Sequence, residues 1–210
     1  MANLSASYLT LSQPLLIFKI QSKDLRPGSA WLLSNSLAFF QTRGVKGMSK
    51  TEKDLMDAFA GESQANRKYL AYCQRAEDEF LHGVAKLFRA IAEAETIHAI
   101  KHLRTAGLVK STKENLEDAL AGETHEFKNM YPEMIAHARE EGQKSAEVSF
   151  DYANKVEAYH AQLYRKALAD PDKFPVQDYY ICKVCGYTAE KNLPDVCPVC
   201  GANTKAFFKV

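Results

Sequence analysis

The chain has 210 residues, of which 46% are hydrophobic and 25% are charged, and its formal net charge is +1. This length allows one good core and at most a small second domain. The near-neutral charge argues against nucleic acid or an acidic membrane surface as the main partner, and no apolar run approaches the ~20 residues of a membrane span.

Residues 1–47 differ from everything after them. They hold seven serines, five Lys or Arg and a single acid, Asp24, without a sustained helical or strand period. Scarce acids and abundant serine are typical of a targeting peptide. The alternative is an upstream extension with translation starting at Met48, because Arg43-Gly44 and Lys46-Gly47 can be written in the purine-rich codons of a ribosome-binding site. Either way, this segment is not expected to belong to the fold.

From Met48 onward, apolar residues recur near the 3.6-residue period of a helix. The expected helices run to about Glu77, from a break at His82-Gly83 to Gly107, from a capping box at Ser111–Glu114 to about Glu141, and over Ser145–Leu168. Pro132 lies inside the third and predicts a kink. Two tightly joined helix pairs predict a four-helix bundle. The middle connection, residues 107–115, could extend over about 30 Å, so the sequence leaves open whether it crosses the bundle or simply turns.

The helical region is an internal duplication. Residues 55–62 match residues 116–123 at six of eight positions with an offset of 61. The Glu-x-x-His pairs, Glu95/His98 and Glu157/His160, follow at an offset of 62, so the second copy has gained one residue. Residues three apart share one helical face, and each pair can therefore aim two ligands at one point. Glu62 and Glu123 add one carboxylate each from the other two helices.

This repeated set of side chains predicts a metal site. One Glu from each of two helices and a Glu-x-x-His from each of the others is the ligand set of ferritin-like di-iron bundles. Unpaired buried carboxylates cost several kcal/mol each, and the basic residues shared by the two copies point away from them. Oxygen and imidazole ligands suit iron or manganese. A solvated helix face explains one Glu-x-x-His pair, but poorly explains two in register with a duplication.

The last part of the chain predicts a second, smaller metal domain. Residues 171–178 form a linker, and residues 179–210 are too few to fold on hydrophobic burial alone. Two Cys-x-x-Cys pairs with eleven residues between them predict a tetrahedral thiolate site for iron or zinc, formed by Cys182, Cys185, Cys197 and Cys200. Such clustering favours a metal site in a reducing, cytoplasmic setting over a disulfide framework. A glycine after each second cysteine permits a turn that points N–H groups at sulfur.

From Met48 to Val210 the chain resembles the rubrerythrin family. The motifs that carry the resemblance are Gly61–Tyr69, Glu95–His98, Gly122–Glu126, Met130–Pro132, Glu157–His160 and the four-cysteine tail. The resemblance implies a ferritin-like four-helix bundle over residues 48–170 and a rubredoxin-like domain over residues 179–210. The cofactors that it implies are two irons in the bundle and one in the tail, where zinc is the alternative.

The same resemblance assigns roles to the candidate residues. Glu95 and Glu157 would bridge two irons, with Glu62 and His98 on one iron and Glu123 and His160 on the other. Glu126 has no twin, since Ala65 stands at the matching position; it would exchange with His98 as the cluster is reduced. Tyr69 and Tyr131 would hydrogen-bond the ligating carboxylates, and plain core tyrosines are the alternative.

The function implied by the resemblance is reduction of hydrogen peroxide to water. Electrons would come from an NAD(P)H-dependent reductase or rubredoxin, through the tail iron. The expected assembly is a cytoplasmic homodimer in which the tail of one subunit lies near the cluster of the other. A ferroxidase or iron-storage relative of ferritin, and a binding module with a structural zinc ribbon, are the alternatives.

Overall fold

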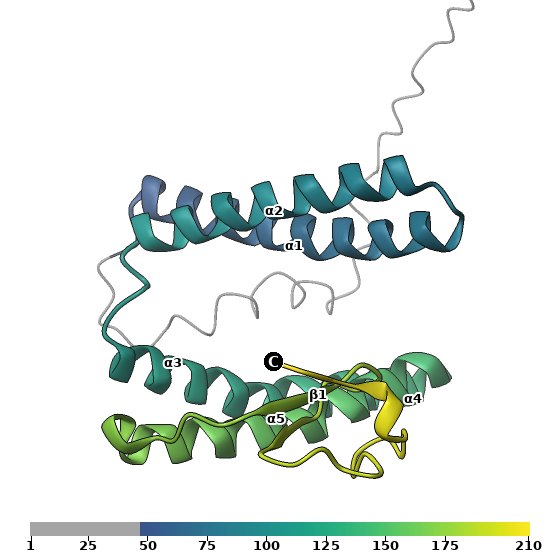
Figure 1. Ribbon diagram of the computed structural model, residues 1–210. Coiled ribbons are helices and arrows are strands. Elements are labelled where there is room, and N and C mark those ends of the chain that lie inside the picture. The colour runs from purple at the N-terminus through teal and green to yellow at the C-terminus, as the bar shows by residue number, and fades with distance from the viewer. Residues whose placement is uncertain (1–46) are drawn as a thin grey trace, which may run out of the picture. The chain divides into compact units, whose positions relative to one another are not determined.

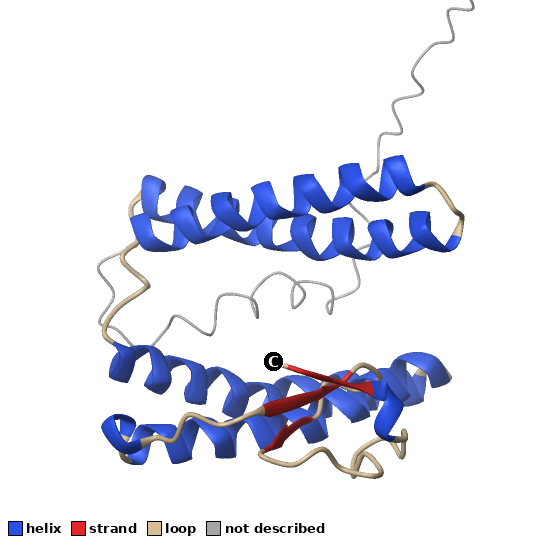
Figure 2. Cartoon of the chain, viewed as in Figure 1, coloured by secondary structure: helices blue, strands red, loops and turns tan. Residues whose placement is uncertain are grey.

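The computed structural model describes residues 47–210, so the interpretation of residues 1–46 as a targeting or upstream segment lies outside the described residues. The described chain consists of five α-helices and a small sheet (Figures 1 and 2). The helices are α1 (Lys50–Asp78), α2 (His82–Thr105), α3 (Thr112–His125), α4 (Tyr131–Glu140) and α5 (Lys144–Ala169). Within this part of the chain, no helix combines the length and apolar character of a membrane span.

The helices pack as two hairpins. α1 lies along α2, and α5 lies along α3 and α4 (Figure 1). We call α1–α2 the first hairpin and α3–α5 the second hairpin. In the first hairpin the two helices approach closely because small residues meet between them, including Cys73, Ala76 and Ala85. Cys73 is 2% exposed and is a small core residue of this hairpin.

A short segment, residues 106–111, connects the two hairpins. α2 ends at Thr105, and Gly107, with φ of +69°, allows the chain to leave the helix. At the other end, Ser111 and Glu114 form the predicted capping box at the start of α3. The connection therefore comprises residues 106–111, which are fewer than the residues 107–115 expected from the sequence.

The third predicted helix is interrupted, which corrects the expectation of one helix kinked at Pro132. A π-helical turn, η3 (Glu126–Met130), separates α3 from α4, and the N–H of Tyr131 donates to the carbonyl of Glu126. Pro132 then falls in the first turn of α4, where a missing N–H costs little.

The π turn accounts for the residue gained in the duplication. A π turn holds one residue more than an α turn because its hydrogen bonds reach five residues back. Asp78 at the end of α1 lies 16 positions after Glu62, whereas Glu140 at the end of α4 lies 17 positions after Glu123. Turns of three residues, 79–81 and 141–143, follow in both copies. The extra residue is therefore accommodated in the wider turn of η3, and α5 keeps the same register relative to the preceding helix.

The tail domain, residues 179–210, contains a three-stranded antiparallel sheet. Its strands are β1 (Tyr179–Cys182), β2 (Thr188–Glu190) and β3 (Phe207–Lys209), in the order β2-β1-β3, with a short 3₁₀ turn at Thr204–Ala206. Another 3₁₀ turn, Pro171–Lys173, lies in the linker before the domain. Cys182, Cys197 and Phe207 form its core, flanked by Tyr180 and Tyr187. Lys166 of α5 donates to Glu190 of β2 at 2.6 Å, so the tail domain rests on the second hairpin.

Candidate metal centres

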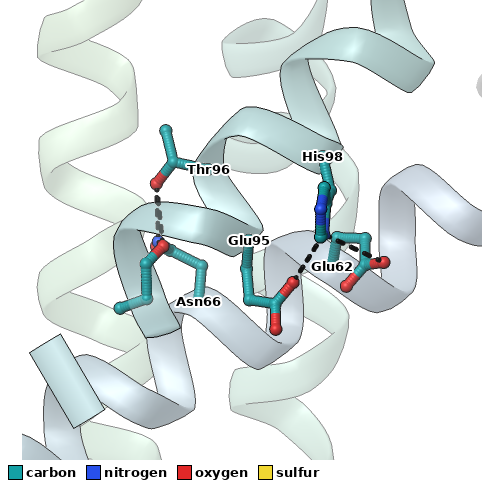
Figure 3. Close-up of polar contacts among 6 residues, drawn as sticks. Glu62, Asn66, Glu95, Thr96 and His98 are labelled. Atoms are coloured by element: carbon teal, nitrogen blue, oxygen red, sulfur yellow. Dashed lines mark hydrogen bonds and ion pairs between the residues drawn. The ribbon is translucent and has the colours of Figure 1, made fainter. Parts of the chain in front are cut away.

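The first hairpin brings three candidate ligands together, which we call the first half-site: Glu62, Glu95 and His98. Ligand atoms of the three lie within 4.8 Å of one another. Nδ1 of His98 is 3.0 Å from a carboxylate oxygen of Glu95 and 3.9 Å from one of Glu62 (Figure 3). The His98 side chain is 54% exposed, so this half-site is open on one side.

A buried amide supports the first half-site from behind. Asn66 lies one turn after Glu62, and its amide donates to the carbonyl of Ala92 at 2.7 Å and to the hydroxyl of Thr96 at 2.8 Å (Figure 3). Thr96 in turn donates to the Ala92 carbonyl. These bonds join α1 to α2 directly beside Glu95, and they fix the relative position of the helices that carry the ligands.

The second hairpin forms a matching second half-site: Glu123, Glu157 and His160. Nδ1 of His160 is 2.7 Å from a carboxylate oxygen of Glu157 and 3.8 Å from one of Glu123. This histidine is only 25% exposed. The structure thus gathers six of the seven candidate residues into two groups of three, one on each hairpin.

The tail domain contacts the second half-site and orients its histidine. Nε2 of His160 lies 3.0 Å from the hydroxyl oxygen of Thr188, and that hydroxyl donates to the carbonyl of Gly186 at 3.3 Å. The hydroxyl oxygen therefore accepts from Nε2–H, which leaves Nδ1 as the nitrogen that faces the carboxylates. The expectation from sequence placed the tail near the cluster of the other subunit, whereas here it contacts α5 of its own chain.

The second half-site favours a cation. Burial raises the pKa of Glu123 and of Glu126, because the carboxylates are withdrawn from water. Burial acts against the charged imidazole, yet the carboxylates of Glu123 and Glu157 raise the pKa of His160 to about 9. Among the described residues, the cationic partners of the half-site carboxylates are the two histidines, not Lys or Arg. Divalent cations would supply the missing positive charge.

Glu126 and Tyr131 lie beside the second half-site, at the two ends of the π turn. Glu126 is outside the group of three, but the charges of Glu157 and Glu123 act on it. Burial, with the charge of Glu126 next, raises the pKa of Tyr131, so this phenol keeps its proton. Tyr69 lies in the first hairpin, where its ring packs against those of Tyr72 and Phe88.

The four cysteines of the tail domain come together as a tetrathiolate site. The Sγ atoms of Cys182 and Cys200 are 3.7 Å apart, and those of Cys185 and Cys197 are 3.5 Å apart. A tetrahedral site with metal–sulfur bonds of ~2.3 Å has sulfur–sulfur edges of roughly 3.8 Å, so the arrangement fits a metal ion.

In the tail domain, the glycine after each Cys-x-x-Cys pair forms the turn that the sequence predicts. Gly186 and Gly201 have φ of +83° and +75°, and each donates its N–H to the carbonyl of the first cysteine of its pair. Although burial acts to raise the pKa of the Cys197 thiol, the N–H groups of Cys200 and Val199 bring it below its ordinary value. Donors aimed at sulfur favour the thiolate that binds metal.

Sequence reasoning missed Thr188 and Tyr164. Thr188 contacts His160, which is 28 positions away in the sequence. The periodicity of helices and strands predicts only contacts between residues that are close in sequence. Tyr164 follows His160 by one helical turn, and burial, with the charges of Glu123 and Glu157, raises its pKa. Tyr164 could have been found from the sequence, because a residue four positions after the candidate ligand His160 lies on the same helical face.

Comparisons with known proteins agree with this geometry. Residues 53–168 match the family model for rubrerythrin, and residues 180–208 match the model for the rubredoxin-like domain of rubrerythrin. Rubrerythrin of Porphyromonas gingivalis is 36% identical over 186 residues, which cover 80% of this chain and 92% of that protein. Rubrerythrin-2 of Clostridium acetobutylicum is 35% identical over 170 residues (73% and 92%). Nigerythrin of Nitratidesulfovibrio vulgaris is 32% identical over 167 residues (73% and 83%).

These matches confirm the predicted fold class, a ferritin-like helical domain followed by a rubredoxin-like domain. They also confirm the predicted cofactor sites, a rubrerythrin-type di-iron site and a rubredoxin-like four-cysteine site.

Proposed function

The chain belongs to the rubrerythrin family, and from that premise we propose that it is a peroxidase that reduces hydrogen peroxide to water. Each turnover breaks one O–O bond, consumes two electrons and two protons, and releases two molecules of water. The proposed division of the chain is a di-iron domain over residues 48–170, a linker over 171–178, and an electron-accepting tail over 179–210.

The proposed ligands are those gathered in the two half-sites. Glu62 and His98 would hold one metal, Glu123 and His160 would hold the other, and Glu95 and Glu157 would be shared between the two. When bound, two ferrous ions supply one electron each to the O–O bond. The carboxylates would stabilise the more highly charged, oxidised metals, since they are partly withdrawn from water and have the two histidines, not Lys or Arg, as cationic partners.

Two residues near the second half-site are proposed to act directly. Tyr131 retains its phenolic proton beside the carboxylates, so it can donate a hydrogen bond to a peroxide oxygen or to a ligand. Glu126 begins a π turn, a feature that often marks functional sites. We assign it the exchange with His98 between redox states that the family resemblance implies; its carboxylate lies close to the second half-site but outside that group of three.

The observation that carries the proposal is the hydrogen-bonded link between the two metal centres. It leads from Cys185 through its neighbour Gly186 to Thr188, and from the Thr188 hydroxyl to His160. One centre is thus joined to a ligand of the other, as an enzyme supplied with electrons through its tail requires. The donor to the tail is proposed to be rubredoxin or an NAD(P)H-dependent reductase.

Metal analysis and peroxide titration of anaerobically purified protein test the proposal. The expected result is about three irons per chain, a visible spectrum of the four-cysteine iron, and reoxidation of the reduced protein by peroxide in preference to oxygen. Steady turnover driven by NADH and a reductase should follow without mineral formation. Oxidation and storage of added ferrous iron would instead support the ferritin-like alternative, and a colourless protein with one zinc would support the binding module.

A further inference from the structure

We propose that each di-iron site is built from two copies of the chain, with the first hairpin of one copy packed against the second hairpin of the other. This inference rests on the proposed di-iron function and adds where the ligands come from. Two such exchanges in a dimer would produce two complete four-helix bundles and two complete sites. The partner is therefore a second copy of this chain.

Neither hairpin holds a complete site by itself. Each half-site offers two carboxylates and one imidazole, whereas a pair of metals bridged by carboxylates needs the ligands of both. The half-sites match because they are copies of one sequence, so a first hairpin and a second hairpin can pair about a local pseudo-two-fold axis, with the two Glu-x-x-His helices facing each other. The two-fold axis of the dimer then relates the two bundles to each other, because each chain gives its first hairpin to one bundle and its second hairpin to the other.

The ferritin-like topology sets a length that the connection between hairpins must cover. In these folds the second and third helices run in the same direction, so one long connection crosses over between them. Thr105 lies seven residues beyond His98, and Thr112 lies eleven residues before Glu123. At ~1.5 Å per residue, with His98 and Glu123 at one level of the bundle, the crossover must rise roughly 27 Å.

The connection is too short to make that crossover within one chain. Leu108 still donates its N–H to the carbonyl of Leu103 in α2, so only the four steps from Leu108 to Thr112 are free. Four fully extended steps reach about 14 Å, roughly half of the rise. The α3 end of the connection is also fixed, because Lys110 exchanges two hydrogen bonds with Asn115 and the capping box holds Ser111.

An apolar strip continues the ligand-bearing face of α2. At ~100° per residue, Val84, Leu87 and Ile91 lie within about 40° of the direction of His98. All three are exposed, Leu87 to 61%. A row of large apolar side chains beside metal ligands marks a surface that is covered in the assembled protein.

The second hairpin and the tail domain enclose a hollow beside the second half-site, with Tyr179, Ile181 and Thr188 on the tail side. A cavity of about 560 Å³ lies next to His160, with walls that include Leu116, Leu163 and Tyr164. Leu116 precedes Glu123 by seven residues, and Val84, Leu87 and Ile91 all precede His98. With α2 and α3 parallel, the strip and the hollow therefore lie at the same end of the bundle. The proposed pairing places apolar side chains where there is space for them.

Mixed dimers of two defective chains test the exchange. One chain carries Glu95→Ala and His98→Ala, the other carries Glu157→Ala and His160→Ala, and different affinity tags allow the mixed dimer to be isolated. Exchange pairs the intact first hairpin of one chain with the intact second hairpin of the other. The mixed dimer should thus regain one paired-iron site, half the wild-type content, while each defective homodimer has none. A mixed dimer without paired iron overturns the proposal.

Extension of the connection gives a second test that does not depend on metal. An insertion of about 18 Gly and Ser residues between Val109 and Lys110 allows the crossover within one chain, so the dimer should become a monomer by light scattering. The same insertion beside Gly142, in the turn between α4 and α5, should leave the dimer intact. A wild-type monomer, or an extended chain that stays dimeric, would contradict exchange.

The two tests also separate this inference from the proposed function. A wild-type protein that binds no paired iron would remove the peroxidase proposal, whereas the oligomeric states of the metal-free chains would still decide whether the hairpins exchange.

Discussion

The contact between the tail domain and His160 is the link between the two metal centres, and Thr188→Val removes it with little change in shape. Valine keeps the volume of threonine but offers no acceptor to Nε2–H of His160. A buried donor left without a partner costs ~1–3 kcal/mol. Since His160 is 25% exposed, water replaces part of the lost bond, and we expect about 1.4 kcal/mol. That free energy is about a tenfold loss in affinity for the metal that His160 is proposed to bind.

Chelator competition on anaerobic ferrous protein measures this loss. The variant should release one iron of the pair at roughly tenfold lower chelator concentration, within the range typical of residues that orient a metal ligand. The visible spectrum of the four-cysteine iron should not change, because none of the four thiols is altered. Stopped-flow mixing of the reduced variant with peroxide should show slower oxidation of the tail iron than of the di-iron site.

Two further variants separate the link from general damage to the tail domain. Thr188→Ser keeps the hydroxyl and should restore both metal affinity and the rate of tail oxidation. Thr204→Val removes a hydroxyl that donates to the carbonyls of Pro194 and Asp195 in the same domain, away from His160, and should leave the iron pair unaffected. Wild-type affinity and electron transfer in Thr188→Val, or equal losses in Thr204→Val, would refute the role of the link.

Three other changes test separate parts of the proposal. Glu126→Ala should leave iron content near wild type yet slow peroxide turnover, as metal analysis and steady-state rates would show; an unchanged rate removes the exchange role. Cys197→Ser should abolish the colour of the tail iron and unfold the tail domain, with the helices intact by circular dichroism. Glu190→Gln should loosen the docking of the tail domain by about 0.2–1 kcal/mol, measured by limited proteolysis. The hydrogen bond from Lys166 lowers the pKa of Glu190 below its ordinary 4.5, so the wild-type contact stabilises above that pH and weakens below it, whereas docking of the glutamine variant should not respond.

The half-sites could be predicted from sequence because each depends on local geometry. Glu95 and His98 share a helical face through their spacing alone, and the duplication repeats that spacing in Glu157 and His160. The positions of Glu62 and Glu123 followed from the same repeat. The four cysteines were equally local, since two short turns position each pair.

The features that the sequence did not reveal depend on contacts between distant segments or on small shifts of helix ends. The change of offset from 61 to 62 between the two copies showed that one residue had been gained. Its position between Glu126 and Met130 is known only from the hydrogen bonds of η3. Thr188 meets His160 because β2 packs on α5, a tertiary contact without periodicity. From the sequence, the connection between the hairpins could have been long enough to cross a bundle. In the structure, α2 extends to Thr105 and α3 begins at Thr112, so only residues 106–111 remain.

Duplication, half-sites and exchange have one physical basis. The first hairpin buries small residues between its helices and leaves carboxylates, an imidazole and an apolar strip for another surface to cover. Metal binding and hairpin association must then stabilise each other, because metals bound by both hairpins favour the associated state. With a connection too short to fold back, that coupling acts between copies of the chain. Paired-iron affinity should therefore weaken on dilution in the wild-type protein and become independent of protein concentration once the connection is extended between Val109 and Lys110.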